Sequence, residues 1–179
     1  ELIDHYQRVA DALTVPLFLY NIPARTGNTL QPETVRTLAA HPNIIGIKDS
    51  AGSYESLSGF LQATADCQDF AVLNGPDSLI HQGFVDGCSA SISGLANVAP
   101  EAINAIWARF HAGDIAGSHQ AQENVTGLRT ALYSIGFSPA AVKKAVSLQG
   151  FEVGESRYAV QFSAEEQQQI RQIVNHYLQ

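Results

Sequence analysis

Apolar residues in the first part of the chain alternate between helical spacing and short continuous runs. Leu2, Tyr6, Val9 and Leu13 recur at helical spacing, which predicts an amphipathic helix over residues 1–13. Short apolar runs bounded by Pro, Gly or Asn predict strands, and a helical pattern follows each of them. The expected strands cover residues 17–20, 44–48, 70–74 and 89–93, and the expected helices run from Pro32 to His41-Pro42 and over 54–65, 77–84 and 100–111.

The strand segments are continuously apolar or small rather than alternating. This pattern is typical of parallel strands that are covered on both faces. The strand–helix unit repeats about every 25 residues, as expected for βα architecture. Four parallel strands do not close a barrel, and the sequence opens with a helix. We therefore expect an α/β fold, either an open four-stranded sheet or the second half of an eight-stranded barrel.

The pattern changes after Gly113. Three helical segments follow, at residues 114–134, 138–149 and 163–178, and no further strand is expected among them. The sequence thus predicts a barrel-like part over residues 1–112 and a C-terminal helical subdomain over 113–179.

Composition narrows the range of partners. The formal net charge is -7, which argues against a nucleic-acid partner because phosphate backbones need a basic face. The histidines and the two cysteines show no metal-ligand spacing, so no metal site is expected. No segment approaches the roughly 20 apolar residues of a membrane span, and the sequence begins directly with the helical pattern rather than a leader. We expect a soluble, cytoplasmic protein.

Lys48 is the first candidate for chemistry. It directly follows the apolar run Ile44–Ile47, and the only other lysines are Lys143 and Lys144. Desolvation at a strand end disfavours an ammonium, and a neutral amine can attack a ketone to form an imine. The alternative is a snorkelling lysine paired with Asp49 or Asp77.

Tyr20 supports the chemical interpretation of Lys48. It ends the preceding strand, so both side chains are expected at the same carboxyl-end rim, where barrel enzymes carry their active sites. A phenol there can exchange protons while the imine forms. Taken alone, a tyrosine at a strand end more often caps a core.

Nearby residues could hold a substrate. Arg25 follows Tyr20 in a loop, and its guanidinium suits a carboxylate, although a loop-bracing ion pair is equally plausible. Gly75 and Ser93-Gly94 follow the third and fourth strands and leave room for a ligand, a weak signal that ordinary turns share.

These segments together resemble one family. Residues 20–27 (Tyr-Asn-Ile-Pro-Ala-Arg-Thr-Gly), Gly46–Ser50 (Gly-Ile-Lys-Asp-Ser) and Ile92 with Ala96-Asn97-Val98 closely resemble the dihydrodipicolinate synthase and N-acetylneuraminate lyase family. The resemblance extends over essentially the whole chain. It implies a (β/α)₈ barrel, here the last four strands, with a C-terminal helical extension, usually tetrameric, that acts on pyruvate or releases it.

The resemblance also implies residue roles. Lys48 resembles the Schiff-base lysine, so no separate cofactor is expected, and Tyr20 resembles the proton-relay tyrosine. Arg25 resembles the arginine that holds the second substrate's carboxylate in the synthase branch. Ile92 resembles the residue whose backbone oxygen faces the pyruvyl group, and Gly75 a rim glycine near the second substrate. The implied partners are a 2-oxo acid and an aldehyde.

Departures from the family pattern leave alternatives open. The first four strands of the family are absent from this sequence, with the loop that binds the pyruvate carboxylate. Asp49 stands where synthases commonly carry Glu, and Gly75-Pro76-Asp77 replaces the commoner Gly-Asp-Asp. Arg25 favours the synthase branch, because sialic acid lyases tend to lack it, whereas Asp49 and Pro76 favour 2-keto-3-deoxy-sugar-acid aldolases. An N-acetylneuraminate lyase-like enzyme is a further alternative. The non-enzymatic alternative is an inactive half-barrel that requires a complementary chain.

Overall fold

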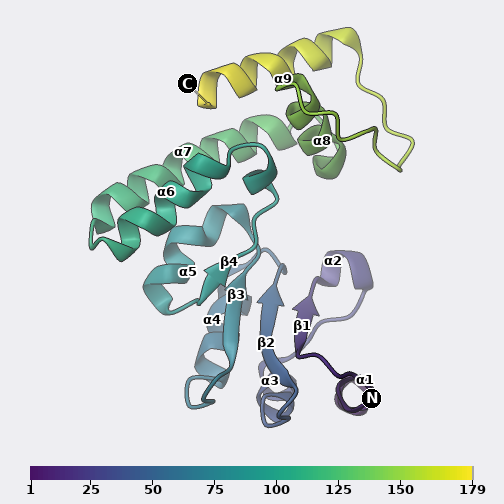
Figure 1. Ribbon diagram of the computed structural model, residues 1–179, viewed down its shortest axis with the longest axis vertical. Coiled ribbons are helices and arrows are strands. Elements are labelled where there is room, and N and C mark those ends of the chain that lie inside the picture. Colours follow the sequence, from purple (N-terminus) through teal and green to yellow (C-terminus); the bar gives the residue numbers. More distant parts are fainter. Residues whose placement is uncertain (179) are drawn as a thin grey trace. The chain divides into compact units, whose positions relative to one another are not determined.

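The structure is a computed structural model that describes residues 1–178, and it divides into two compact units. The first unit comprises Glu1–Ile92, and the second begins at Ser93. The first unit alternates strands and helices, whereas the second is helical (Figure 1).

The first unit follows the strand–helix order expected from the sequence. Its elements are α1 (Leu2–Ala12), β1 (Leu17–Asn21), α2 (Pro23–Thr26), α3 (Pro32–Leu38), β2 (Ile44–Asp49), α4 (Tyr54–Ala63), β3 (Ala71–Asn74), the 3₁₀ turn η1 (Asp77–Leu79), α5 (Ile80–Asp86) and β4 (Ala90–Ser91). The four strands form one parallel sheet in the order β1-β2-β3-β4. All four carboxyl ends therefore lie at the same edge of the sheet, and the expected α/β class is confirmed.

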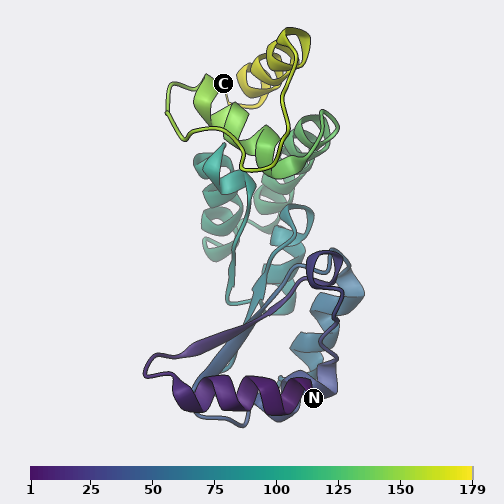
Figure 2. The same ribbon diagram turned by 90° about the vertical axis from the view of Figure 1, so that its right-hand side faces the viewer.

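One face of this sheet carries the core of the first unit. Helices α1, α3 and α4 pack on it, and the turned view shows α3 and α4 on one side of β1 and β2 (Figure 2). Its buried side chains include Leu19, Ile47 and Val72 from the strands and Val35, Leu38, Leu57 and Phe60 from the helices. Burial of this apolar surface is the main favourable contribution to folding of the unit.

The opposite face of the sheet is more open within the described chain. Phe18 and Tyr20 on β1 are 40% and 46% exposed, while Leu19 between them is fully buried. The ring of Phe18 lies against Gly46 on β2, where a Cβ atom would collide with it. The continuous apolar pattern of β1 thus coexists with unequal burial of its two faces.

Two short elements differ from the sequence expectation. Helix α2 was not expected, because its four residues are too few to show helical periodicity; Pro23 begins it and Gly27 ends it with a positive φ of 68°. The strand expected over 89–93 is shorter, with only Ala90 and Ser91 in the ladder. The residues in this segment are small, so the sequence pattern does not show where hydrogen-bonded pairing with β3 ends.

The second unit consists of η2 (Leu95–Asn97), α6 (Pro100–His111), α7 (Ile115–Tyr133), α8 (Ser138–Leu148) and α9 (Ala164–Tyr177). Helix α6 packs mainly against α7, so packing groups it with the later helices and the compact units divide after Ile92. The subdomain boundary after residue 112 reflects the change of sequence pattern and stays a prediction. None of the helices described has the length and apolarity needed to cross a membrane.

Candidate active site

Lys48 and Tyr20 meet at the carboxyl ends of β2 and β1. They are directly paired in the parallel register, so their side chains leave the sheet on the same face. Lys48 Nζ donates a hydrogen bond to the hydroxyl oxygen of Tyr20 at 3.3 Å and lies 4.5 Å from the centre of the phenol ring. An amine and a phenol thus stand close to proton-transfer distance, which is about 2.6–3.2 Å between heavy atoms.

The competing interpretation of Lys48 required a carboxylate partner. Among the described residues, Lys48 takes part in no ion pair, with Asp49 or with Asp77. Asp49 follows Lys48 in an extended strand and therefore projects from the opposite face, where its carboxylate is fully buried and accepts hydrogen bonds from Asn21 and from the backbone N–H of Ala51. The structure favours the amine–phenol pair over the snorkelling ion pair.

Lys48 itself is half-buried in the described chain, and Tyr20 is exposed. The strong desolvation expected of a lysine at a strand end is not present in this chain by itself and stays a prediction for the intact natural polypeptide. The geometry of the pair does not depend on it, because the register of β1 and β2 places the two groups together.

The three predicted substrate-binding residues also lie beyond the carboxyl ends of strands in the first unit. Arg25 lies exposed on α2, which leaves the end of β1 (Figure 1). Ile92 directly follows β4, and its N–H donates to the carbonyl oxygen of Asn74 at 2.9 Å. Their roles in substrate binding stay predictions.

Gly75 has a structural explanation besides the expected one. Its N–H donates to the carbonyl oxygen of Asp49 at 2.8 Å, and a Cβ atom at this position would collide with that oxygen and with Ser50 Oγ. The close approach of β3 to β2 therefore already requires glycine. A contact with substrate is an additional role that stays a prediction.

A buried polar layer on the helix-facing side of the strand ends was missed by the sequence analysis. Asn21 on β1 is paired in register with Asp49 on β2, which in turn is paired with Asn74 on β3. All three side chains are almost fully buried. Asn21 bonds Asp49, and Asn74 bonds Ser91 on β4. A polar residue directly after each apolar run was the available signal, although strand ends are commonly polar.

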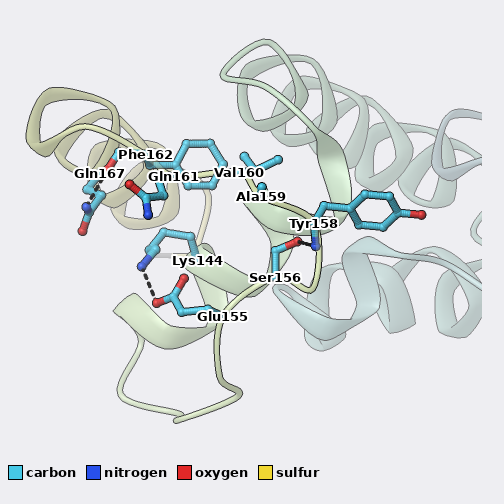
Figure 3. A pocket seen from close by; sticks show the side chains of 9 residues that line it. All are labelled: Lys144, Glu155, Ser156, Tyr158, Ala159, Val160, Gln161, Phe162 and Gln167. Atoms are coloured by element: carbon cyan, nitrogen blue, oxygen red, sulfur yellow. Dashed lines mark hydrogen bonds and ion pairs between the residues drawn. The ribbon is translucent and has the colours of Figure 1, made fainter.

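A cavity in the second unit does not compete with this site. It has a volume of about 450 Å³ and is lined by residues of α8, of the segment 155–162 and of α9 (Figure 3). Its amine, Lys144, is bonded to Glu155 at 3.1 Å, and Tyr158 points away from the other labelled side chains. Lys144 is therefore a poorer candidate nucleophile than Lys48.

The histidine, cysteine and acidic side chains of residues 1–178 form no group of three or more that could hold a metal ion. Whether the protein uses no separate cofactor stays a prediction.

Known proteins resemble the chain over almost its full length. The sequence model of the dihydrodipicolinate synthetase family matches residues 1–177. A 4-hydroxy-tetrahydrodipicolinate synthase of Methanoculleus marisnigri is 37% identical over 177 residues, which are 98% of this chain and 60% of that protein. The 4-hydroxy-tetrahydrodipicolinate synthase of Archaeoglobus fulgidus is 35% identical over 174 residues, which are 97% of this chain and 59% of that protein. The chain thus spans about 60% of the length of these relatives.

Solved structures give the same result. A dihydrodipicolinate synthase from Bacteroides thetaiotaomicron superposes with a TM-score of 0.90 at 27% identity, over 98% of this chain and 60% of that one. YagE, a prophage protein of the dihydrodipicolinic acid synthase family from E. coli K12 solved in complex with pyruvate, has a TM-score of 0.90 at 28% identity and the same coverage. The fold class expected from the sequence, that of the (β/α)₈ barrel family, is confirmed. The chain belongs to the dihydrodipicolinate synthetase family.

Proposed function

We propose that this chain carries the Schiff-base centre of a pyruvate-dependent class I aldolase, most similar to 4-hydroxy-tetrahydrodipicolinate synthase. The observation that carries the proposal is the 3.3 Å contact between Lys48 Nζ and the Tyr20 hydroxyl at neighbouring strand ends. Relatives that carry this enzyme name, and a solved relative that binds pyruvate, support the choice of substrate. Because the chain spans about 60% of those relatives, the activity is proposed for the intact natural polypeptide.

The first step is imine formation. The neutral Lys48 amine attacks the ketone carbon of pyruvate, forming a C–N bond while the carbonyl oxygen takes up a proton from the Tyr20 hydroxyl. The tyrosinate recovers a proton from the nitrogen. Tyr20 then gives a proton to the carbinol oxygen, which leaves as water, so the iminium on Lys48 stands beside a tyrosinate.

The iminium then serves as the electron sink. The tyrosinate takes up a methyl proton, which gives an enamine. The enamine carbon attacks the aldehyde carbon, the aldehyde oxygen takes the proton of Tyr20, and the iminium returns. Addition of water to the iminium, with return of a proton to Tyr20, releases the product and the free Lys48 amine. This chemistry needs no separate cofactor. Arg25 is proposed to orient a carboxylate of the aldehyde substrate, with Gly75 near it and the Ile92 backbone oxygen facing the pyruvyl group.

A second candidate is an aldolase of 2-keto-3-deoxy-sugar acids or an N-acetylneuraminate lyase-like enzyme. Both use the same imine but a different partner aldehyde, and Asp49 and Pro76 favour the sugar-acid aldolase. The homotetrameric state implied by the resemblance and the cytoplasmic location expected from the sequence pattern stay predictions; one relative of solved structure is a monomeric dihydrodipicolinate synthase variant.

Borohydride trapping tests the proposal. The intact natural polypeptide is incubated with pyruvate, reduced with sodium borohydride and digested for peptide mass mapping. We expect a 1-carboxyethyl group on the amine nitrogen of Lys48 and none on Lys143 or Lys144. Reduction without pyruvate is the control.

The outcomes separate the candidates. Absence of an adduct on Lys48 contradicts the imine mechanism altogether. An adduct followed by turnover only with sugar-derived aldehydes, in a panel of aldehydes and 2-oxo acids, assigns the second candidate instead of the first.

A further inference from the structure

Asn21 lies directly after Tyr20 and points to the opposite, helix-facing side of β1. It is only 1% exposed and is paired in register with Asp49, the residue that follows Lys48. Its amide nitrogen donates to Asp49 Oδ1 at 2.8 Å. Each residue of the amine–phenol pair is therefore followed by a member of a buried hydrogen-bonded pair that joins the same two strands.

The main chain strengthens this connection between β1 and β2. The N–H of Ser50 donates to the carbonyl oxygen of Asn21 at 2.8 Å, and Asp49 Oδ1 also accepts the N–H of Ala51 at 3.1 Å. The ends of the two strands are thus joined by both side-chain and backbone bonds one residue beyond Tyr20 and Lys48. A buried hydrogen-bond network of this kind restricts the relative movement of its members.

The carbonyl oxygen of the Asn21 amide anchors the loop that contains Arg25. Asn21 Oδ1 accepts the backbone N–H of Leu30 at 3.1 Å, and Leu30 is buried. Residues 22–29 between them are half-buried or exposed. The amide therefore closes the base of this loop while its middle, with α2 and Arg25, remains at the surface.

We propose that Asn21 is a positioning residue that holds the Tyr20 hydroxyl against the Lys48 amine and fixes the base of the Arg25 loop. This inference rests on the proposed imine function. A displacement of about 1 Å between reacting groups can reduce a rate roughly a hundredfold, so a bond that sets the end of β1 against the end of β2 has kinetic consequences.

The amide of asparagine satisfies both partners at this position. Asp49 needs a donor and the Leu30 N–H needs an acceptor, and asparagine supplies one of each. An aspartate at position 21 keeps the acceptor but places two buried carboxylates face to face. Replacing both residues, Asn21→Asp with Asp49→Asn, restores a donor–acceptor pair between positions 21 and 49 with the roles reversed and removes the facing carboxylates. The Ala51 N–H loses its acceptor in this variant, because it bonds the same Asp49 oxygen, so the recovery is expected to be partial.

The experiment compares Asn21→Asp, the exchanged double variant and wild type in the intact natural polypeptide. The measurements are kcat, KM for pyruvate and the rate of borohydride trapping, each normalised to correctly folded sites by the final adduct yield. Thermal melting is measured in parallel. Asn43→Asp is the matched control, because Asn43 also donates from a half-buried amide, to the carbonyl oxygen of Ala10 at 2.9 Å, but lies next to the other end of β2.

We expect Asn21→Asp to lower kcat and the trapping rate per folded site by about 10- to 100-fold. The exchanged variant should recover at least part of that loss, and Asn43→Asp should lower the melting temperature with kcat per site unchanged. Where Asn21→Asp does not yield folded protein, Asn21→Ser, which is neutral and shorter, takes its place with the same expectation.

The inference is overturned if the Asn21 variant melts at a lower temperature but keeps its wild-type kcat and trapping rate per site. Absence of recovery in the exchanged variant also overturns it. Both results leave the imine function intact if wild type still traps pyruvate on Lys48. Absence of trapping in wild type refutes the proposed function itself, so the two failures are distinguishable.

Discussion

Replacement of Tyr20 by phenylalanine removes the hydroxyl of the proposed proton relay and leaves the aromatic ring in place. The ring contact with Lys48, 4.5 Å from Nζ to the ring centre, is retained, so a change in rate reports on the hydroxyl alone. Positioned acid–base groups contribute about 10²- to 10⁴-fold to a rate, or roughly 2.7–5.4 kcal/mol of transition-state stabilisation. We expect Tyr20→Phe to lower kcat by that factor.

The effect of the same change on stability is expected to be small. Tyr20 is 46% exposed, and its hydroxyl bonds only a half-buried amine, so its loss should lower the free energy of unfolding by less than about 1 kcal/mol. The assay combines steady-state kinetics on pyruvate and an aldehyde with thermal melting by circular dichroism. Tyr54→Phe is the matched control, because Tyr54 is comparably exposed and begins α4 rather than ending a strand.

The reasoning is refuted if Tyr20→Phe retains kcat within about threefold of wild type while Lys48 still forms the imine. A loss of kcat that is accompanied by an equal loss in the Tyr54→Phe control also refutes it, because the effect would then not be specific to the Tyr20 hydroxyl. A large loss confined to Tyr20→Phe, with unchanged melting, supports the relay.

Three further predictions concern stability and reactivity. Burial raises the pKa of the Cys88 thiol to about 12, so at pH 8 an alkylating reagent should modify the half-buried Cys67 first. Mass spectrometry of the protein and its peptides over time measures the two rates, and faster alkylation of Cys88 contradicts the prediction. The Arg36 guanidinium, which bonds both oxygens of Asp66, lowers the pKa of that carboxyl below 3.8. Its stabilising effect is therefore present above pH 3.8 and is lost as the pH falls through the lowered value, so melting temperatures of wild type and Asp66→Asn should differ slightly at pH 6 and converge at the acid end. Gly75→Ala should lower the free energy of unfolding in urea by about 1–3 kcal/mol, because the added methyl overlaps a carbonyl oxygen at the end of β2; an unchanged midpoint would show that the strands can separate there.

The alternation of strands and helices followed from the sequence because it depends on local periodicity. Apolar runs too short for helices, separated by amphipathic segments, predicted all four strands and their parallel arrangement. The resemblance of the segments around Tyr20 and Lys48 to a known family predicted the residues of the candidate site. Helix α2 escaped prediction because its four residues, begun by Pro23, are shorter than the window that periodicity requires.

The sequence by itself indicated that Tyr20 and Lys48 lie near the carboxyl ends of neighbouring strands, since parallel strands joined by helices share one carboxyl edge. Only the tertiary structure decided that the two are paired residue for residue, because the strands shift register between Leu17 and Phe18 and a slip of one more position would turn Lys48 to the other face. The partnership of Asn21 with Asp49 likewise required the fold, since it joins positions 28 residues apart. Local pattern records which residues are apolar, whereas the register of non-local strands is set by packing of the whole sheet against its helices.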